Sequence, residues 1–317
     1  MPDPARHTSL GTGHEFDAVR TLLARWGDRA RGVGDDAATL DLPPGARLVV
    51  STDTSAEDVH FRRGWFTPAE IGWRAATSAL SDLAAMAARP VGLLLAASVP
   101  AGWRDALPEI GDGVGEAAAA VGCPIVGGDL TAARELVLTV TVLGAAARPL
   151  TRDGARPGDR LYVTGRLGGP RRALHALLAG NVPTPGDRDR FARPRARIAE
   201  AIWLAAQGAR ALVDISDGLL ADAGHVAAAS RGVLRLESVR IPRVDGASPD
   251  DALVGGEEYE LLCATPELLD EAAFAHAFGI PLTRVGDVLA LDDGVSRVVV
   301  AGGARVDLPA GHDHFTR

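Results

Sequence analysis

The chain has 317 residues, of which 47% are apolar and only 4% aromatic, and its net charge is −8 at pH 7. That length favours two domains over one, and the composition requires a core built mainly from Ala, Val and Leu. All 33 basic residues are arginine, which excludes a Walker-type phosphate loop because such a loop needs a lysine after its glycines. The acidic balance also argues against a nucleic-acid partner, since phosphate backbones are bound by basic patches.

The cysteines and the N-terminus indicate a cellular location. Cys123 and Cys263 lie far apart and show neither metal-ligand spacing nor a disulfide framework, which fits a reducing compartment. Residues 1–14 have no apolar signal core, and no apolar run reaches transmembrane length. We therefore expect a cytoplasmic protein that has no membrane partner.

Hydrophobic periodicity predicts alternating helices and strands in the first half. In chain order these are a helix at 15–26, a strand at 47–50 that ends in Ser51-Thr52-Asp53-Thr54, a helix at 68–88, a strand at 91–99, a helix at 105–121, an apolar pair at 125–126 that runs into Gly127-Gly128-Asp129, and a strand at 136–143. The glycine-rich run 111–115 follows no strand, so we reject it as a dinucleotide fingerprint.

The second half follows a Pro-, Gly- and charge-rich boundary at 145–160. We expect a strand at 161–164, a glycine turn at 165–169, helices to about 207 with a loop at 181–189, a strand at 211–215, a helix at 219–230, a strand after the glutamates of 253–264 and a strand near 296–300. The turn before the helix at 219 offers backbone amides and a positive dipole end, which is an environment that suits phosphate. The alternative is that Asp217 or Ser216 merely caps that helix.

Acidic residues recur beside glycine, serine or threonine along the whole chain. The recurring set is Asp36, Asp53, Asp82, Asp129, Asp214 and Asp217. Hard oxygens of this kind suit Mg²⁺, and an acidic site that binds an anionic nucleotide needs cations between the two. Each member also has a simpler explanation. Asp36 and Asp53 fit a solvated turn and an edge strand, and Asp82 fits the exposed edge of its helix.

Taken together, the motifs resemble those of the thiamine-monophosphate kinases, in the superfamily of aminoimidazole-ribotide synthetase, selenophosphate synthetase and HypE. The matching motifs are GDDAA (34–38), STDT with VHF (51–61), SDLAAMAARP (81–90), VGGDLT (126–131), TRDGARPGD (151–159), DISDGLLAD (214–222) and GGEEYELL (255–262). Each is weak alone, but the ordered set is specific and covers nearly the whole chain.

The resemblance implies an α/β (α+β) fold of two domains. Residues 1–148 would form an N-terminal domain with a mixed sheet and helices, which binds ATP and magnesium and dimerises through its sheet. Residues 149–317 would form a C-terminal α/β domain that closes the active site. The implied reaction converts ATP and thiamine monophosphate to ADP and thiamine diphosphate by direct in-line transfer, without a phosphoenzyme, in a homodimer.

The resemblance also implies roles for individual residues, position by position. Several Mg²⁺ ions would be held by Asp36, Ser51, Thr52, Asp53, Asp82, Asp129, Asp214 and Asp217. ATP would contact Asp112, Gly128, Asp129, Arg152 and Ser216. Thiamine monophosphate would face His60, Glu257 and His312. No catalytic side chain is assigned, because a phosphate monoester is largely deprotonated near neutral pH and needs no general base.

Three positions depart from the usual family pattern. Glu258 replaces an aspartate, one threonine of the usual GGDTT is gone because the chain reads Asp129-Leu130-Thr131, and His312 replaces a large aromatic residue that would stack on the thiamine ring. The alternatives are another ATP-dependent enzyme of the superfamily or a non-catalytic nucleotide-binding homologue. Selenophosphate synthetase fits less well, because this N-terminus lacks the cysteine and lysine of that enzyme.

Overall fold

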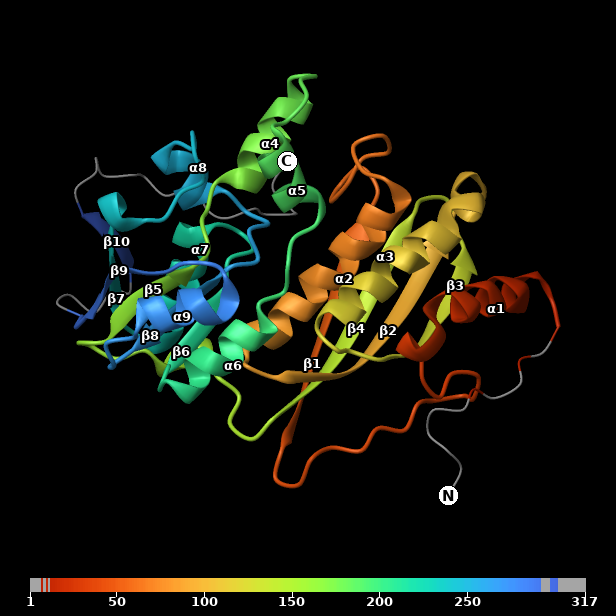
Figure 1. Ribbon diagram of the computed structural model, residues 1–317, viewed down its shortest axis with the longest axis horizontal. Helices are drawn as coiled ribbons and strands as arrows, with labels where there is room; N and C mark the ends of the chain where they lie inside the picture. The colour runs from red at the N-terminus through yellow and green to blue at the C-terminus, as the bar shows by residue number, and fades with distance from the viewer. Residues whose placement is uncertain (1–6, 8–9, 11, 292–296, 302–317) are drawn as a thin grey trace. The chain divides into compact units, whose positions relative to one another are not determined.

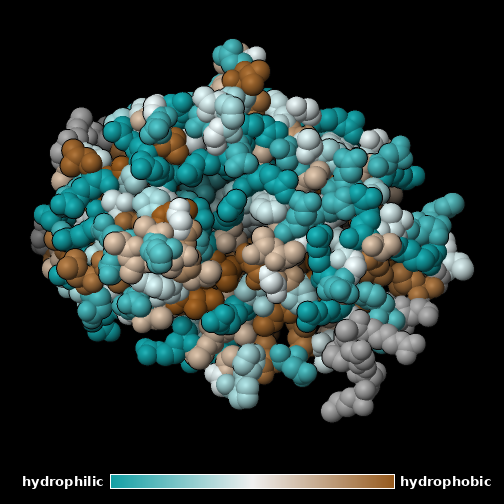
Figure 2. All heavy atoms as spheres, in the orientation of Figure 1, coloured by the Kyte–Doolittle hydropathy of each residue, from teal (hydrophilic) through white to brown (hydrophobic). Residues whose placement is uncertain are grey.

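The computed structural model describes residues 7, 10, 12–291 and 297–301. The chain divides into two compact units (Figure 1). Unit 1 comprises residues 1–83 and 88–148, and unit 2 comprises residues 84–87 and 149–317. In the described part of the chain, no helix combines the length and the apolar character needed to cross a membrane. Hydrophilic side chains cover most of the surface visible in Figure 2.

Unit 1 is a mixed sheet packed against helices. Its elements are α1 (His14–Trp26), η1 (Gly27–Arg29), β1 (Arg47–Ala56), α2 (Pro68–Ala85), β2 (Arg89–Val99), η2 (Ala101–Ala106), α3 (Leu107–Ala120), β3 (Ile125–Ala132) and β4 (Val137–Ala146). The strand order is β1-β4-β2-β3. The first two pairs are antiparallel and the last is parallel. The order of helices and strands predicted from the sequence is confirmed here.

Two predicted boundaries in unit 1 are wrong. The strand predicted at 47–50 continues through the hydroxylic and acidic residues to Ala56, because each residue of that run pairs with β4. The helix predicted at 68–88 ends at Ala85, and Ala87 has a φ of 50°. The side chains at 51–54 therefore follow the period of a strand and alternate between its two faces.

Glycines in α2 and α3 allow these two helices to pack closely against each other. A Cβ on Gly113 would lie 1.8 Å from the carbonyl oxygen of Ala69, and one on Gly72 would lie 1.9 Å from that of Ile110. Helices α2 and α3 thus touch backbone to backbone, which only glycine permits. Close helix packing therefore explains the glycine-rich run 111–115, which we rejected as a dinucleotide fingerprint.

The unit 1 sheet has two unlike faces. Val140 of β4 and Leu95 of β2, which are paired in register, are buried, and α2 and α3 cover this side of the sheet in Figure 1. On the other face, Leu48 is 50% exposed and Val50 is 56% exposed. Large apolar residues in the open on a strand face are typical of an interaction surface.

Unit 2 contains a second mixed sheet. Its elements are η3 (Arg152–Gly154), β5 (Arg160–Thr164), α4 (Gly169–Leu178), α5 (Pro185–Ala192), α6 (Ile198–Ala206), β6 (Ala211–Asp214), α7 (Leu219–Ser230), β7 (Val233–Glu237), η4 (Ser238–Arg240), α8 (Pro249–Val254), β8 (Leu261–Thr265), α9 (Glu271–Phe278), β9 (Leu282–Leu289) and β10 (Arg297–Ala301). The strand order is β10-β7-β9-β5-β8-β6. Helix α7 packs into the main apolar cluster through Leu219, Ala223 and Val226.

Strand directions bring several loops to one edge of the unit 2 sheet. Strands β8 and β9 run antiparallel to β5, β6 is antiparallel to β8, β7 is antiparallel to β9, and β10 is parallel to β7. The ends of β5, β6 and β7 therefore meet the starts of β8 and β9. We call this the loop edge of unit 2, and it carries the turns 165–168 and 215–218, the loop 238–248, the segment 255–260 and residues 279–281.

The sequence did not predict strands β7 and β9. Strand β9 carries a register irregularity against β5 at Leu161/Tyr162, and its Gly286 lies so close to β7 that a Cβ would be 1.9 Å from the carbonyl oxygen of Arg235. An irregular strand with an interior glycine lacks the strict alternation that identifies strands in a sequence.

Candidate functional site

Ser51 and Asp53 occupy the helix-covered side of β1 in unit 1. They pair in register with Val142 and Val140 of β4, both of which are buried. The Ser51 hydroxyl donates a hydrogen bond to Oδ2 of Asp82 on α2. The structure thus links a strand hydroxyl to the carboxylate that interrupts an apolar helix, and Asp82 has further interactions. This is a group of hard oxygen ligands of the kind that Mg²⁺ prefers.

Thr52 points to the opposite face of the sheet. It pairs with Thr141, and the two hydroxyls are 3.0 Å apart; Thr54 and Thr139 form the next such pair at 3.1 Å. A cation bound by Ser51 and Asp53 would therefore be reached from Thr52 only through its backbone.

The other predicted acids of unit 1 are more exposed. Asp36 lies in an open turn, where its N–H donates to Oδ1 of Asp35 at 2.9 Å. Asp129 lies in β3, is exposed, and is paired with Ala96, which places it on the face opposite Asp53. The preceding Gly128 has a φ of 159°, and a Cβ there would lie 2.0 Å from the carbonyl oxygen of Leu95. Glycine is therefore required at this position.

The carboxylate of Asp112 is paired with an arginine of unit 1. Both of its carboxylate oxygens accept hydrogen bonds from Arg25 of α1, one from Nε at 2.7 Å. This bidentate pair raises the pKa of Arg25, and it joins α1 to α3. Asp112 therefore has a structural role, which weakens its candidacy as a contact for ATP.

His60 follows β1 in a tight turn. Its Nδ1 accepts the N–H of Ala56 at 3.1 Å, so in the neutral ring the proton lies on Nε2. The nearby Glu57 accepts a hydrogen bond from Nε1 of Trp103 at 2.8 Å. The predicted substrate residue thus presents an N–H donor.

The DISDG turn of unit 2 is built around a residue that we did not predict. Oδ2 of Asp222 on α7 accepts the N–H groups of Ser216, Asp217 and Gly218, each at 3.1 Å. Burial raises the pKa of Asp222 to about 8, with the nearby Asp214 and Asp217 adding repulsion. The amides that we expected to be open to phosphate are therefore already occupied by a carboxylate.

The same turn brings a histidine close to two acids. Ligand atoms of Asp217, Asp222 and His225 lie within 4.8 Å of one another, and among the described residues this is the one such group of three. Asp214 is buried at the end of β6, whereas Asp217 is exposed. The expected side-chain cap from Asp217 or Ser216 is absent from this turn, because Gly218 is the N-cap and Asp222 binds the amides instead.

The GGEEYE segment is held in an unusual backbone conformation. Glu257 and Tyr259 have φ values of 60° and 52°, a region that is costly for residues with a Cβ. Their N–H groups donate to the carbonyls of Ser216 at 2.7 Å and Ile215 at 2.9 Å. The segment is therefore fixed against the DISDG turn, and Glu257 is presented from a strained loop of the kind that is common at functional sites.

Two buried glutamates support this loop edge from behind. Glu260 forms a two-point pair with Arg197 at 2.6 and 2.9 Å. Glu258 accepts the N–H of Gly168 through Oε1, while its Oε2 is buried and has no partner in the described structure. Burial raises the pKa of Glu258 well above its usual value, with Glu260 adding repulsion.

The remaining predicted site residues are Arg152, Ser216 and His312. Arg152 is exposed in η3, and its carbonyl accepts the hydroxyl of Ser230 at 2.7 Å. Ser216 lies in the DISDG turn described above. His312 lies outside the described residues. The sequence analysis did not select Asp222 and His225. The charge of Asp222 in the first turn of an otherwise apolar helix was a usable signal.

Comparisons with known proteins identify the family of the chain. Residues 34–146 match the family described as AIR synthase related protein, N-terminal domain. The chain is 35% identical over 323 residues to the thiamine-monophosphate kinase of Escherichia coli (strain K12), an alignment that covers 93% of this chain and 97% of that protein.

Solved structures give the same picture. The fold is similar to the thiamine-monophosphate kinase of Stenotrophomonas maltophilia K279a, with a TM-score of 0.81 and 34% identity over 93% of this chain and 98% of that one. A structure of AaThiL complexed with AMPPCP and TMP gives a TM-score of 0.75 at 29% identity, covering 97% of this chain and 100% of the other.

Proposed function

The chain belongs to the thiamine-monophosphate kinases, ATP-dependent phosphotransferases of thiamine diphosphate biosynthesis, and from this premise we propose how its residues carry the reaction. The γ-phosphoryl group of ATP passes directly to the phosphate of thiamine monophosphate. Both reactants are anionic, so positioning and charge neutralisation account for most of the catalysis. The observation that carries the proposal is the oxygen-rich group of Ser51, Asp53 and Asp82, in a chain that is closely similar to these kinases over most of its length.

We propose that both units bind magnesium through carboxylates. In unit 1 the donors are Ser51, Asp53 and Asp82, together with Asp36, Asp129 and the backbone of Thr52. In unit 2 they are Asp214 and Asp217. Donors that are all oxygen suit Mg²⁺ rather than a soft metal. When bound, the ions screen the negative charge of the two phosphates.

The side chains of the chain itself bind and orient the reactants. Gly128 lets the backbone of β3 approach ATP, which Asp129, Arg152 and Ser216 also contact. The Nε2–H of His60 donates to the phosphate of thiamine monophosphate, while Glu257 and His312 bind the thiamine body. Asp222 holds the amides of the DISDG turn and so fixes the direction in which Asp217 points. No general base acts, because the acceptor phosphate is already deprotonated near neutral pH.

We also propose that two copies associate through the open face of the unit 1 sheet. Leu48 and Val50 lie exposed there, beside the two threonine pairs. Burial of such a face is worth roughly 25 cal/mol per Å². Val50→Asp would place a charge within the face and should yield monomers in analytical ultracentrifugation. If this variant stays dimeric, the interface lies elsewhere.

An assay of the purified chain tests the function as a whole. With ATP, Mg²⁺ and thiamine monophosphate, thiamine diphosphate and ADP should form in equal amounts, and chelation of Mg²⁺ should stop the reaction. Unphosphorylated thiamine should not be accepted, because it lacks the acceptor phosphate. Turnover with thiamine but not with its monophosphate would refute the proposed acceptor. The cytoplasmic location expected from the sequence stays a prediction.

A further inference from the structure

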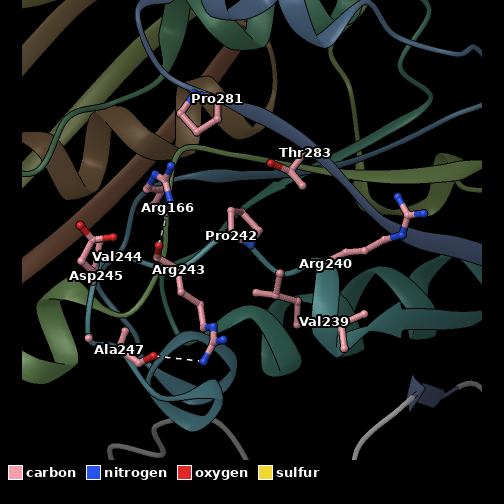
Figure 3. A pocket seen from close by; sticks show the side chains of 12 residues that line it. Arg166, Val239, Arg240, Pro242, Arg243, Val244, Asp245, Ala247, Pro281 and Thr283 are labelled. Atoms are coloured by element: carbon pink, nitrogen blue, oxygen red, sulfur yellow. Dashed lines mark hydrogen bonds between the residues drawn. The ribbon is translucent and has the colours of Figure 1, made fainter.

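A pocket on the loop edge of unit 2 has no role in the function proposed above. Its volume is about 490 Å³, within the range of small-molecule sites. Its lining comes from Arg166 after β5, the segment 239–247 after β7, and Pro281 and Thr283 around the start of β9 (Figure 3). None of these residues belongs to the proposed metal, ATP or thiamine monophosphate sets.

The lining is rich in positive charge, although the chain as a whole is acidic. Arg166, Arg240 and Arg243 line the pocket together with one acid, Asp245. Arg240 is paired with Glu237 at 2.6 Å. Arg166 donates a hydrogen bond to the carbonyl of Arg243 at 3.2 Å, and Arg243 donates one to the carbonyl of Ala247 at 3.1 Å. A guanidinium has five N–H donors, so both arginines keep donors for an anion.

The backbone around the pocket is already fixed. The N–H of Leu167 donates to the carbonyl of Pro242 at 2.9 Å, and that of Val244 donates back to Leu167 at 3.0 Å. Gly165 donates to the carbonyl of Pro281 at 2.8 Å. Two prolines and these cross-links limit the motion of the walls, which lowers the entropic cost of binding.

The pocket also offers an apolar surface between its charged sides. In Figure 3, Arg166 and Arg240 lie at opposite sides, with Pro242 and Thr283 between them. Val239, which lines the same pocket, is 85% exposed. A ligand with one apolar face would cover Val239 and Pro242 and remove them from water.

We infer that this pocket binds a phosphate monoester that carries a neutral apolar ring. The phosphate contacts the guanidinium groups of Arg166 and Arg243, and the ring packs on Pro242. Thiamine phosphates fit less well, because packing their cationic thiazolium ring on Pro242 would remove a charge from water. The pocket is therefore an anion site separate from the thiamine monophosphate site, and it stands independently of the proposed kinase mechanism.

Calorimetry with phenyl phosphate as the probe tests the inference directly. The titration is done on the full chain in EDTA, where the acidic metal residues repel anions and do not compete. Saturable one-site binding is expected, tighter than that of inorganic phosphate because the ring adds apolar contact. Thiamine monophosphate should bind more weakly than phenyl phosphate under these conditions. Absence of saturable binding by phenyl phosphate would overturn the inference, whatever the kinase assay shows.

Substitutions locate the site. Arg166→Gln and Arg243→Gln should each weaken phenyl phosphate binding about tenfold, the value of one charge-assisted hydrogen bond. Arg156→Gln is the matched control, because Arg156 is exposed at the opposite edge of the same sheet. Asp245→Asn should tighten binding about two- to threefold by removing a like charge, a gain that misfolding cannot produce. Equal affinities in all four variants would place the binding elsewhere and overturn the inference.

Discussion

The two units hold their acidic residues in different ways. In unit 1, Asp53 and Asp129 project from strands. The position of Asp53 follows from the strand period, whereas Asp129 comes after a register shift between β2 and β3 and is exposed. In unit 2, Asp214 and Asp222 are buried at a tight turn, and Asp222 binds three backbone amides. Asp53 and Asp129 of unit 1 can therefore be replaced without loss of the fold, whereas Asp222 of unit 2 is part of it.

The largest expected effect is on turnover in unit 1. Asp53→Asn and Asp129→Asn remove one negative charge each while keeping the side-chain shape. We expect kcat to fall at least about 100-fold, a typical cost of losing one electrostatic contact in the transition state. The unfolding midpoint and the dimer should not change. Near-normal turnover of either variant would show that its carboxylate holds no ion.

The next effect is on stability, and it separates two acids of one turn. Asp222→Ala leaves three N–H groups without their acceptor, and we expect the free energy of unfolding to fall by about 3 kcal/mol. Asp217→Ala is the control, since its side chain is exposed and its loss should change stability by less than about 0.5 kcal/mol. Urea unfolding monitored by circular dichroism distinguishes them. Equal stability of the two variants would contradict the structural role of Asp222.

This contrast also explains what could be predicted from the sequence. Amphipathic helices such as 15–26 and alternating strands such as 136–143 were predicted well, because burial on one face fixes their period. The candidate acidic residues were selected from the ordered motifs, and their roles stay predictions. The side of the sheet on which Thr52 lies could not be predicted, since it depends on the pairing with Thr141. The role of Asp222 also escaped prediction, because three backbone amides converge on it only in the folded turn.

A buried acid of unit 2, Glu258, is also expected to make the free energy of unfolding depend on pH. Glu258 is buried in unit 2. Burial raises its pKa well above the usual value. The N–H of Gly168 and the charge of Arg190 lower the pKa, whereas Glu260 and Asp187 raise it. Its folded pKa exceeds its unfolded pKa, so its contribution to stability is complete below about pH 4.5 and is lost as the pH rises through the folded pKa. Glu258→Gln keeps an acceptor for the N–H of Gly168 but cannot ionise. The variant should therefore gain stability relative to wild type as the pH rises above 5.

The Glu258 prediction is checked by urea unfolding between pH 5 and 9. Wild type should lose stability more steeply than Glu258→Gln across this range. Glu57→Gln, in the less buried unit 1 turn, serves as a control that should follow the wild-type slope. Parallel curves for wild type and Glu258→Gln would mean that Glu258 is ionised in the folded protein.

The smallest expected effect concerns two adjacent residues of β1 in unit 1. Ser51 and Thr52 both carry a hydroxyl but point to opposite faces: Ser51 reaches Asp82, and Thr52 reaches Thr141. Ser51→Ala removes a neutral ligand and the hydrogen bond to Asp82, so the concentration of Mg²⁺ giving half-maximal turnover should rise about five- to tenfold, equivalent to about 1 kcal/mol. Thr52→Val keeps the backbone oxygen and should leave that concentration unchanged. If Thr52→Val raised the Mg²⁺ requirement as much as Ser51→Ala did, the ion assigned to Ser51 and Asp53 would instead depend on the open face of the sheet, where Thr52 and Asp129 lie.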